Sequence, residues 1–163
     1  MQELSTVRLA QLISQRRRCL VQLRDLGQRQ AALIDDGETA ALMPLIAAKY
    51  QLIEALQRIE AALGPFQAED PEQRVWESPA ARAACAADAE AGRRLLEEVM
   101  EYERANERRM TARRDEVARQ LQQVVDATQV RQAYQQHQRS APIAVAAEPR
   151  AAPRDRLDLS THG

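Results

Sequence analysis

Apolar side chains recur every seven residues along the first part of the chain, and this repeat constrains the fold more than any other feature. A seven-residue apolar repeat makes a seam along one side of an α-helix, and the seam is stable only when it packs against another helix. A second apolar row beside the seam widens the face and indicates more than one neighbouring helix. Within residues 3–36 the seam contains Leu12, Cys19, Leu26 and Leu33, and the second row contains Ile13, Leu20 and Ile34.

A second amphipathic segment begins after a very short turn. Gly37 ends the first helix, because glycine readily adopts the left-handed backbone of a helix C-cap, and Ser5 is the predicted N-cap. Apolar residues at alternating steps of three and four then predict a helix over residues 39–63, with Lys49 at one seam position. Since the link is only about three residues long, the two helices should run antiparallel as a hairpin.

The start of this second helix has two interpretations. Thr39 is a plausible cap, whereas Pro44 lacks a backbone donor and is comfortable only in a first turn. Either the regular helix starts near Met43, or a kinked turn precedes it.

One very long helix is predicted over residues 80–138, with Ser78 as its cap and Pro79 at its first position. At a rise of about 1.5 Å per residue it would span nearly 90 Å. Only its first half has enough apolar side chains to cover the hairpin, so the second half should protrude or pair with another chain. The predicted seam contains Gly92, Leu96, Val99, Met110, Val117, Leu121 and Val124, flanked by Leu95 and Tyr102, with Glu103, Asn106 and Arg113 at polar seam positions.

Two segments have the composition of loops. Residues 64–79 carry three prolines together with Phe66 and Trp76. These aromatic residues either pack the loop onto the hairpin or form an exposed patch for a partner. Residues 140–163 are rich in Pro and Ala, which is the composition of an extended, disordered tail.

These segments together predict an all-α fold: an extended helical hairpin plus one very long helix, in an antiparallel coiled-coil-like bundle. The helical domain covers residues 1–139 and the tail covers residues 140–163. The composition agrees, because aromatic residues make up only 3% of the chain and there are only 5 glycines. Such a chain has few large side chains with which to fill a thick globular core.

The sequence argues against an enzyme and against a nucleic-acid-binding protein. It contains no glycine-rich phosphate loop and no nucleophile elbow, and its acidic residues alternate with arginines as solvated ion pairs do. Its net charge is −1, and the one basic triplet, residues 16–18, has no aromatic neighbours on which bases could stack. No catalytic residue and no cofactor is therefore predicted.

Metal binding, secretion and membrane insertion are also not indicated. Cys19 and Cys85 lie far apart, with no second cysteine or histidine near either at the spacing of metal ligands. A disulfide between them is not supported, because the N-terminus lacks the layout of a signal peptide. No apolar run approaches the roughly 18 residues of a membrane span. We expect a cytoplasmic protein that works through helix–helix contacts with other proteins.

The order of features resembles the FlgN family of flagellar type III export chaperones, which are small all-helical proteins. The turn IDDGETAAL precedes a second helix with a central lysine, LIAAKYQLIEAL. The long helix carries GRRLLEEVMEYERANERRM and RRDEVARQL and ends in AYQQ, before a proline-rich tail that closes with RLDL. The resemblance covers nearly the whole chain, from about residue 4 to residue 159.

The resemblance implies a function and a set of contact residues. FlgN-type chaperones bind the helical C-terminal segments of hook–filament junction (hook-associated) proteins, prevent their premature association and deliver them to the export gate. In this chain Tyr134, Arg156, Leu157 and Asp158 would face the export gate. The client would contact the long helix at Leu96, Val99, Glu103, Asn106, Met110, Arg113, Val117, Leu121 and Val124. Without a client the chain could form a homo-oligomer.

Two other functions remain open from the sequence. One is a different coiled-coil secretion factor, such as a stalk protein of the export ATPase. The other is a structural adaptor protein built on the same kind of helix.

Overall fold

The computed structural model describes residues 5–159, with side chains up to residue 140. Within this range the fold is all-α and contains no strand, as the sequence predicts. The helices are α1 (Thr6–Asp36), α2 (Thr39–Gln67) and α3 (Pro79–Leu159), with a short 3-10 helix η1 (Pro71–Gln73) before α3. The chain divides into two units, Met1–Arg113 and Arg114–Gly163, and α3 contributes to both.

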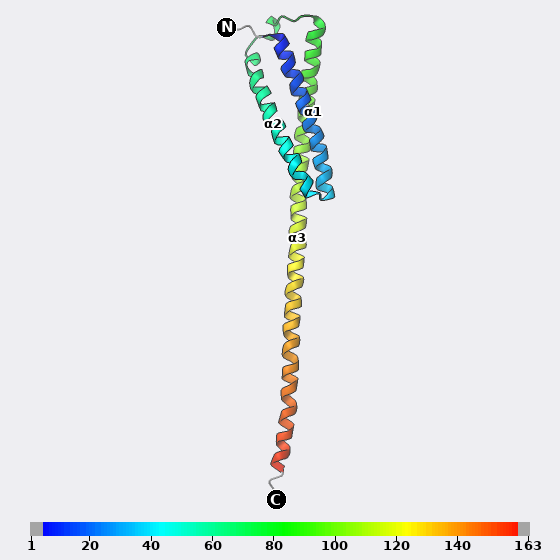
Figure 1. Ribbon diagram of the computed structural model, residues 1–163, viewed down its shortest axis with the longest axis vertical. Helices are drawn as coiled ribbons and strands as arrows, with labels where there is room; N and C mark the ends of the chain where they lie inside the picture. The colour runs from blue at the N-terminus through cyan, green and yellow to red at the C-terminus, as the bar shows by residue number, and fades with distance from the viewer. Residues whose placement is uncertain (1–4, 160–163) are drawn as a thin grey trace. The chain divides into compact units, whose positions relative to one another are not determined.

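Helix α1 is delimited by the caps that its sequence predicts. Ser5 accepts a hydrogen bond from the backbone N–H of Val7 at 3.2 Å, which satisfies one of the free donors of the first turn. At the other end Gly37 has a φ of 72°, a left-handed conformation that disfavours side chains. Its N–H donates to the carbonyl of Ile34 at 3.1 Å, and the next N–H donates to that of Leu33 at 3.0 Å. This cap reverses the chain into α2, so that α1 and α2 form the predicted hairpin (Figure 1).

Helix α2 differs from its prediction at both ends. It begins at Thr39, which is a helical residue rather than the cap, and Pro44 lies inside the helix. It also continues through Pro65 to Gln67 rather than ending at residue 63. The last turn is held by tertiary contacts, because Phe66 is buried in the core and its carbonyl accepts a hydrogen bond from Arg74 at 2.8 Å. Packing here outweighs the local preference of a Gly-Pro pair to end a helix.

The connection from α2 to α3 packs back onto the bundle, which is one of the two arrangements that the sequence leaves open. Trp76 lies partly buried against the cluster that contains Phe66, and Thr6 donates to the carbonyl of Val75 at 2.8 Å. Helix α3 then begins as predicted: Ser78 accepts from the N–H of Ala81 at 3.1 Å, and Pro79 is the first helical residue.

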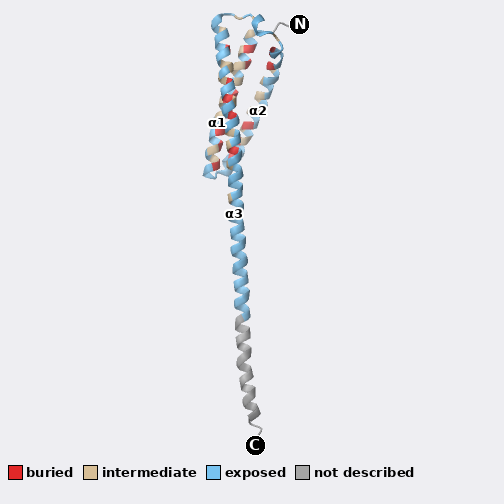
Figure 2. Cartoon of the chain, turned by 180° about the vertical axis from the view of Figure 1, so that it is seen from behind, coloured by how far each residue is buried: buried red, intermediate tan, exposed pale blue. Residues whose placement is uncertain are grey.

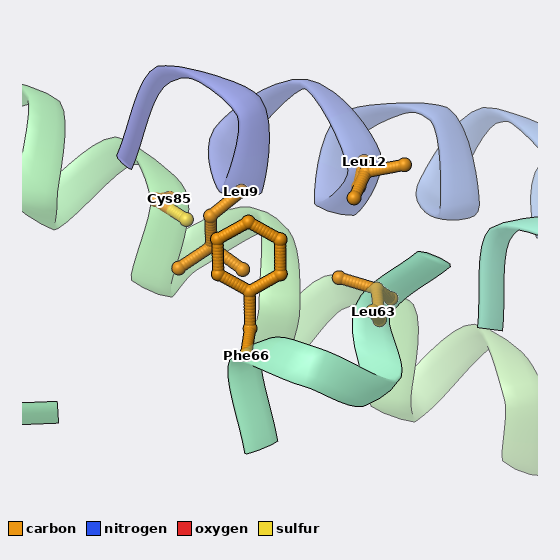
Figure 3. Packing of buried hydrophobic residues seen from close by; sticks show 5 residues of the cluster. All are labelled: Leu9, Leu12, Leu63, Phe66 and Cys85. Carbon is orange, nitrogen blue, oxygen red and sulfur yellow. The ribbon is translucent and has the colours of Figure 1, made fainter. Parts of the chain in front are cut away.

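Two apolar clusters hold the three helices of the first unit together. Figure 3 shows the first cluster, in which side chains from α1, α2 and α3 converge on the ring of Phe66. Its buried members are Leu9, Leu12, Leu63, Phe66 and Cys85. The second cluster contains the buried residues Cys19, Leu20, Leu23, Leu95 and Val99, with half-buried side chains of α2 packed against it. Each fully buried Leu contributes about 1.5–3 kcal/mol, so these clusters are the main source of stability.

The contacts along the bundle set the direction of each helix. Leu9 meets Cys85 in the first cluster and Leu20 meets Leu95 in the second, so α1 and α3 run parallel in this unit. The hairpin makes α2 antiparallel to both. Figure 2 shows the buried residues on the sides of these helices that face one another.

The helical backbone of α3 reaches Leu159, past residue 138, where the sequence predicts its end. That prediction gave Pro142, Pro149 and Pro153 more weight than the strong helix formers between them. The side chains of the predicted tail from residue 141 onward lie outside the described residues, so its disorder stays a prediction.

Candidate functional site

The residues predicted to bind a client divide between the two units. Leu96, Val99, Glu103, Asn106, Met110 and Arg113 belong to the first unit, and Val117, Leu121 and Val124 belong to the second. Their side chains differ in exposure to solvent, and several of them pack inside the bundle.

Val99 and Asn106 lie inside the bundle rather than on its surface. Val99 is part of the second apolar cluster, and Leu96 packs against the same cluster. Asn106 is only 1% exposed, and its side-chain amide donates to the backbone carbonyl of Gly27 at 3.0 Å. Its side-chain oxygen accepts from Arg109 at 3.2 Å. These residues hold α3 against α1, so a client could reach them only if the bundle opened.

One of the two rows of α3 that face α1 lies one position earlier than the sequence predicts, whereas the other row, which contains Gly92, Val99 and Asn106, is buried. Leu95 is buried and Tyr102 is half-buried, whereas Glu103 and Met110 are exposed. Tyr102 lies against Gly27, where an added Cβ would be 3.0 Å from the tyrosine Cβ, and its hydroxyl accepts from Gln28 at 3.1 Å. Leu95 and Tyr102 therefore belong to the seam, whereas the sequence predicted that they flank it.

A layer of polar residues continues the core toward the α1–α2 turn. The ammonium group of Lys49 donates to the side-chain oxygen of Gln30 at 2.7 Å, and both residues are buried. The same ammonium group forms an ion pair with Glu103 on α3. Among the described residues no buried side-chain polar atom lacks a partner. The sequence placed Lys49 at a seam position, but it did not reveal that this residue binds Gln30.

The second unit offers a different surface, because every residue from Val117 to Ser140 is exposed. Val117, Leu121 and Val124 follow each other at steps of four and three, so they share one face of the helix. Leu121 is 61% exposed and Val124 is 63% exposed. Val125 is also exposed and lies at the edge of this face, although it is not one of the predicted seam positions. We call Val117, Leu121, Val124 and Val125 the apolar row.

The residues predicted to contact the export gate are only partly described. Tyr134 is exposed, and its hydroxyl accepts a hydrogen bond from Gln138 at 3.0 Å. The side chains of Arg156, Leu157 and Asp158 lie outside the described residues, so their role stays a prediction.

The part of the chain that the structure describes contains no cluster of metal ligands. No group of three or more His, Cys, Asp or Glu side chains there could hold a metal ion. An open hollow of about 600 Å³ lies beside α1. The charged residues that line it are Arg18 and Glu77, and its lining contains no histidine or cysteine. Between residues 5 and 159, no helix has an apolar stretch that could cross a membrane.

The two cysteines are free thiols buried in different apolar clusters. Burial raises the pKa of the Cys19 thiol, which donates to the carbonyl of Leu52 at 3.2 Å. Burial also raises the pKa of the Cys85 thiol, the negative charge of Asp88 raises it further, and Arg74 opposes the shift. Raised pKa values reduce the thiolate fraction, so neither cysteine has the properties of a reactive nucleophile.

The chain matches no protein-family model, no curated protein and no solved structure. A function must therefore be argued from the sequence pattern and from the surfaces just described.

Proposed function

We propose that this chain is a cytoplasmic export chaperone of the FlgN type. In this proposal it binds the helical C-terminal segments of hook–filament junction proteins, prevents their premature association and delivers them to the flagellar type III export gate. The exposed apolar row on α3 is the single observation that carries the proposal, and the resemblance in the order of sequence features names the client.

The apolar row suits the temporary binding of an amphipathic helix. An unassembled amphipathic helix exposes an apolar stripe and tends to aggregate, and a second helix with a matching row can cover that stripe. Val117, Leu121 and Val124 present such a row to solvent. The polar residues around the row keep the uncovered chaperone helix compatible with water.

The size of the row also suits a contact that must be released. Covering one Val or Leu completely contributes about 1.5–3 kcal/mol at most, and association itself costs at least about 4 kcal/mol. Since the row has four members, an affinity in the micromolar range is expected rather than a permanent complex. A client bound in this way can be handed on at the export gate.

The bundle of the first unit is not expected to bind the client. Its apolar clusters and polar layer are already satisfied by α1 and α2. Opening them would expose buried Leu side chains, at a cost greater than the row alone can offset. The client therefore contacts the second unit first.

The direct test measures binding of a synthetic junction-protein C-terminal segment to the full-length chain by titration calorimetry. Val124→Gln should weaken binding about tenfold, because it places a polar group in the contact. Val130→Gln is the matched control, because Val130 is 70% exposed and falls outside the row on the helical period. Both substitutions introduce a good helix former at an exposed position, so folding should be unaffected.

Three results would count against the proposal. The absence of binding by the wild-type chain would overturn the client assignment. Equal binding by Val124→Gln and the wild-type chain would show that the apolar row is not the contact. Capture of the export ATPase in place of the client would favour a different secretion factor.

A further inference from the structure

The charges around the apolar row are arranged unevenly. From Val117 to Arg139 the sequence contains three arginines, Arg119, Arg131 and Arg139, and one acidic residue, Asp126. This part of the second unit is therefore basic, although the whole chain has a net charge of −1.

An arginine flanks the apolar row at each end of the same helix face. Toward the C-terminus, steps of four and three residues lead from Val124 to Thr128 and then to Arg131. Toward the N-terminus, the same steps lead from Leu121 to Val117 and then to Arg114. The two arginines are about 25 Å apart along the helix axis. Arg119 and Asp126 fall on the opposite side of the helix, so they do not interrupt the face.

Both terminal arginines are open to solvent. The side chain of Arg114 is 76% exposed, and its guanidinium lies 3.5 Å from the carboxylate of the adjacent Asp115. Arg131 is exposed, and the sequence has no acidic residue within four positions of it. A guanidinium of this kind gains most from a carboxylate on another molecule, because the pair can form two parallel hydrogen bonds.

A second copy of this chain is a poor occupant of the face. In the antiparallel register that covers the whole row, Leu121 meets Val124, which places Arg114 opposite Arg131. In a parallel pair with matched register, each arginine meets its own counterpart. Like charges facing each other across a helix pair are destabilising, so either arrangement is disfavoured at both ends.

We infer that the occupant is an amphipathic helix of another protein whose apolar face is uncharged for about three turns and is bounded by an Asp or Glu at each end. This inference rests on the proposed function and deepens it, because it defines which helices the chaperone recognises. The apolar centre supplies the affinity, and the two arginine–carboxylate pairs fix the position of the client helix along α3.

Designed peptides can test this charge pattern with the full-length chain. One amphipathic helical peptide carries a row of leucines bounded by Glu at both ends, and a second carries the same row bounded by Lys. Fluorescence anisotropy at low salt should show binding of the Glu-bounded peptide about tenfold tighter than that of the Lys-bounded peptide. The difference should shrink at about 1 M salt, because exposed ion pairs are then screened.

Charge reversals on the chain complete the test. Arg114→Glu/Arg131→Glu should invert the preference, so that the Lys-bounded peptide binds more tightly. Arg119→Glu is the control, because this arginine lies on the opposite side of the helix and the preference should survive its reversal. All of these residues are exposed, so the variants should fold.

The outcomes separate this inference from the proposed function. Equal affinity for the two peptides, or a preference unchanged by the double reversal, would overturn the charge pattern even if a junction-protein segment binds. A preference for the Glu-bounded peptide without any binding of a junction-protein segment would keep the charge pattern and overturn the client. Self-association of the chain that excludes both peptides, seen by sedimentation, would identify a second copy as the occupant and overturn the inference.

Discussion

Asn106 on α3 donates its side-chain amide to the backbone carbonyl of Gly27 on α1 across 3.0 Å. This approach is possible because Gly27 has no side chain, and Tyr102 occupies the space that a Cβ would take. A carbonyl inside a helix already accepts an intrahelical bond, and its second lone pair here binds the neighbouring helix. The contact fixes the distance between α1 and α3 at the boundary between the apolar clusters and the polar layer.

Gly27→Ala should destabilise the bundle in spite of the higher helix propensity of alanine. The new Cβ would lie 3.0 Å from the Cβ of Tyr102, which is close to the backbone and cannot swing away. Overpacking of this kind costs about 1–3 kcal/mol, and the gain in propensity of up to about 1 kcal/mol offsets part of it. A net loss of about 1 kcal/mol in the free energy of unfolding is expected, measured by urea denaturation.

Gly92→Ala is the matched control, because Gly92 is buried like Gly27 but lies on α3 rather than on α1. Its added Cβ would meet the far end of the Arg16 side chain at 3.0 Å, and that flexible group can move. The variant should be as stable as the wild type or slightly more stable. If Gly27→Ala also proved neutral, the close approach of α1 and α3 would not limit stability.

The number and order of the helices could be predicted because each depends on local signals. The heptad repeat, the caps Ser5 and Ser78 and the turn glycine Gly37 act within a few residues of their own position. These features are confirmed, as is the all-α hairpin bundle.

The inward row that contains Leu95 and Tyr102 could not be predicted because Leu95 and Leu96 are adjacent and equally apolar. Either can begin a row with a seven-residue period, and only the position of α1 decides between them. Packing also decided the end of α2, where the burial of Phe66 holds a helical turn beyond Gly64 and Pro65. Both errors concern tertiary contacts, which no sequence window contains.

Only part of the candidate site could be predicted, because tertiary contacts also decide which seam residues stay exposed. Val117, Leu121 and Val124 are exposed as expected, since no other segment of comparable apolar pattern was left to cover them. Val99 and Asn106 are buried, because the bundle uses the first part of the same seam. A heptad pattern identifies a contact face but does not say whether the partner is internal or external.

Because Lys49 binds Gln30, the losses of unfolding free energy caused by substituting each residue should not be additive. Lys49→Met alone removes the donor to the Gln30 oxygen, at 2.7 Å, and leaves a buried acceptor unsatisfied. The expected cost is about 1–3 kcal/mol of unfolding free energy. In the double variant Gln30→Leu/Lys49→Met both polar groups are gone, so much of the stability should return. A double-mutant cycle of urea denaturation curves measures this dependence, and strictly additive losses would contradict it.

The two buried thiols should report on opening of the bundle. Burial raises the pKa of both Cys19 and Cys85, so little thiolate is present at neutral pH, and the packed helices block reagent. A disulfide-exchange reagent such as DTNB should modify the native chain about a hundredfold more slowly than the chain in urea. Cys19→Ala leaves one thiol and allows the two clusters to be followed separately. Equal rates in native and denaturing buffer would mean that the bundle opens readily.

Glu90 should make the free energy of unfolding depend on pH in the acid range. Hydrogen bonds from Arg93 hold the pKa of this carboxyl at about 2, below its ordinary value of 4.5. A carboxyl with a lower pKa in the folded state stabilises that state above its unfolded pKa, and this contribution is lost as the pH falls from about 4.5 to about 2. Glu90→Gln should therefore make the fall in unfolding free energy over this range less steep. The carboxyl is exposed to solvent, so the effect should be small and should disappear at high salt. Thermal unfolding followed by circular dichroism across this pH range measures it, and an identical pH dependence in wild type and variant would show that the ion pair does not contribute to stability.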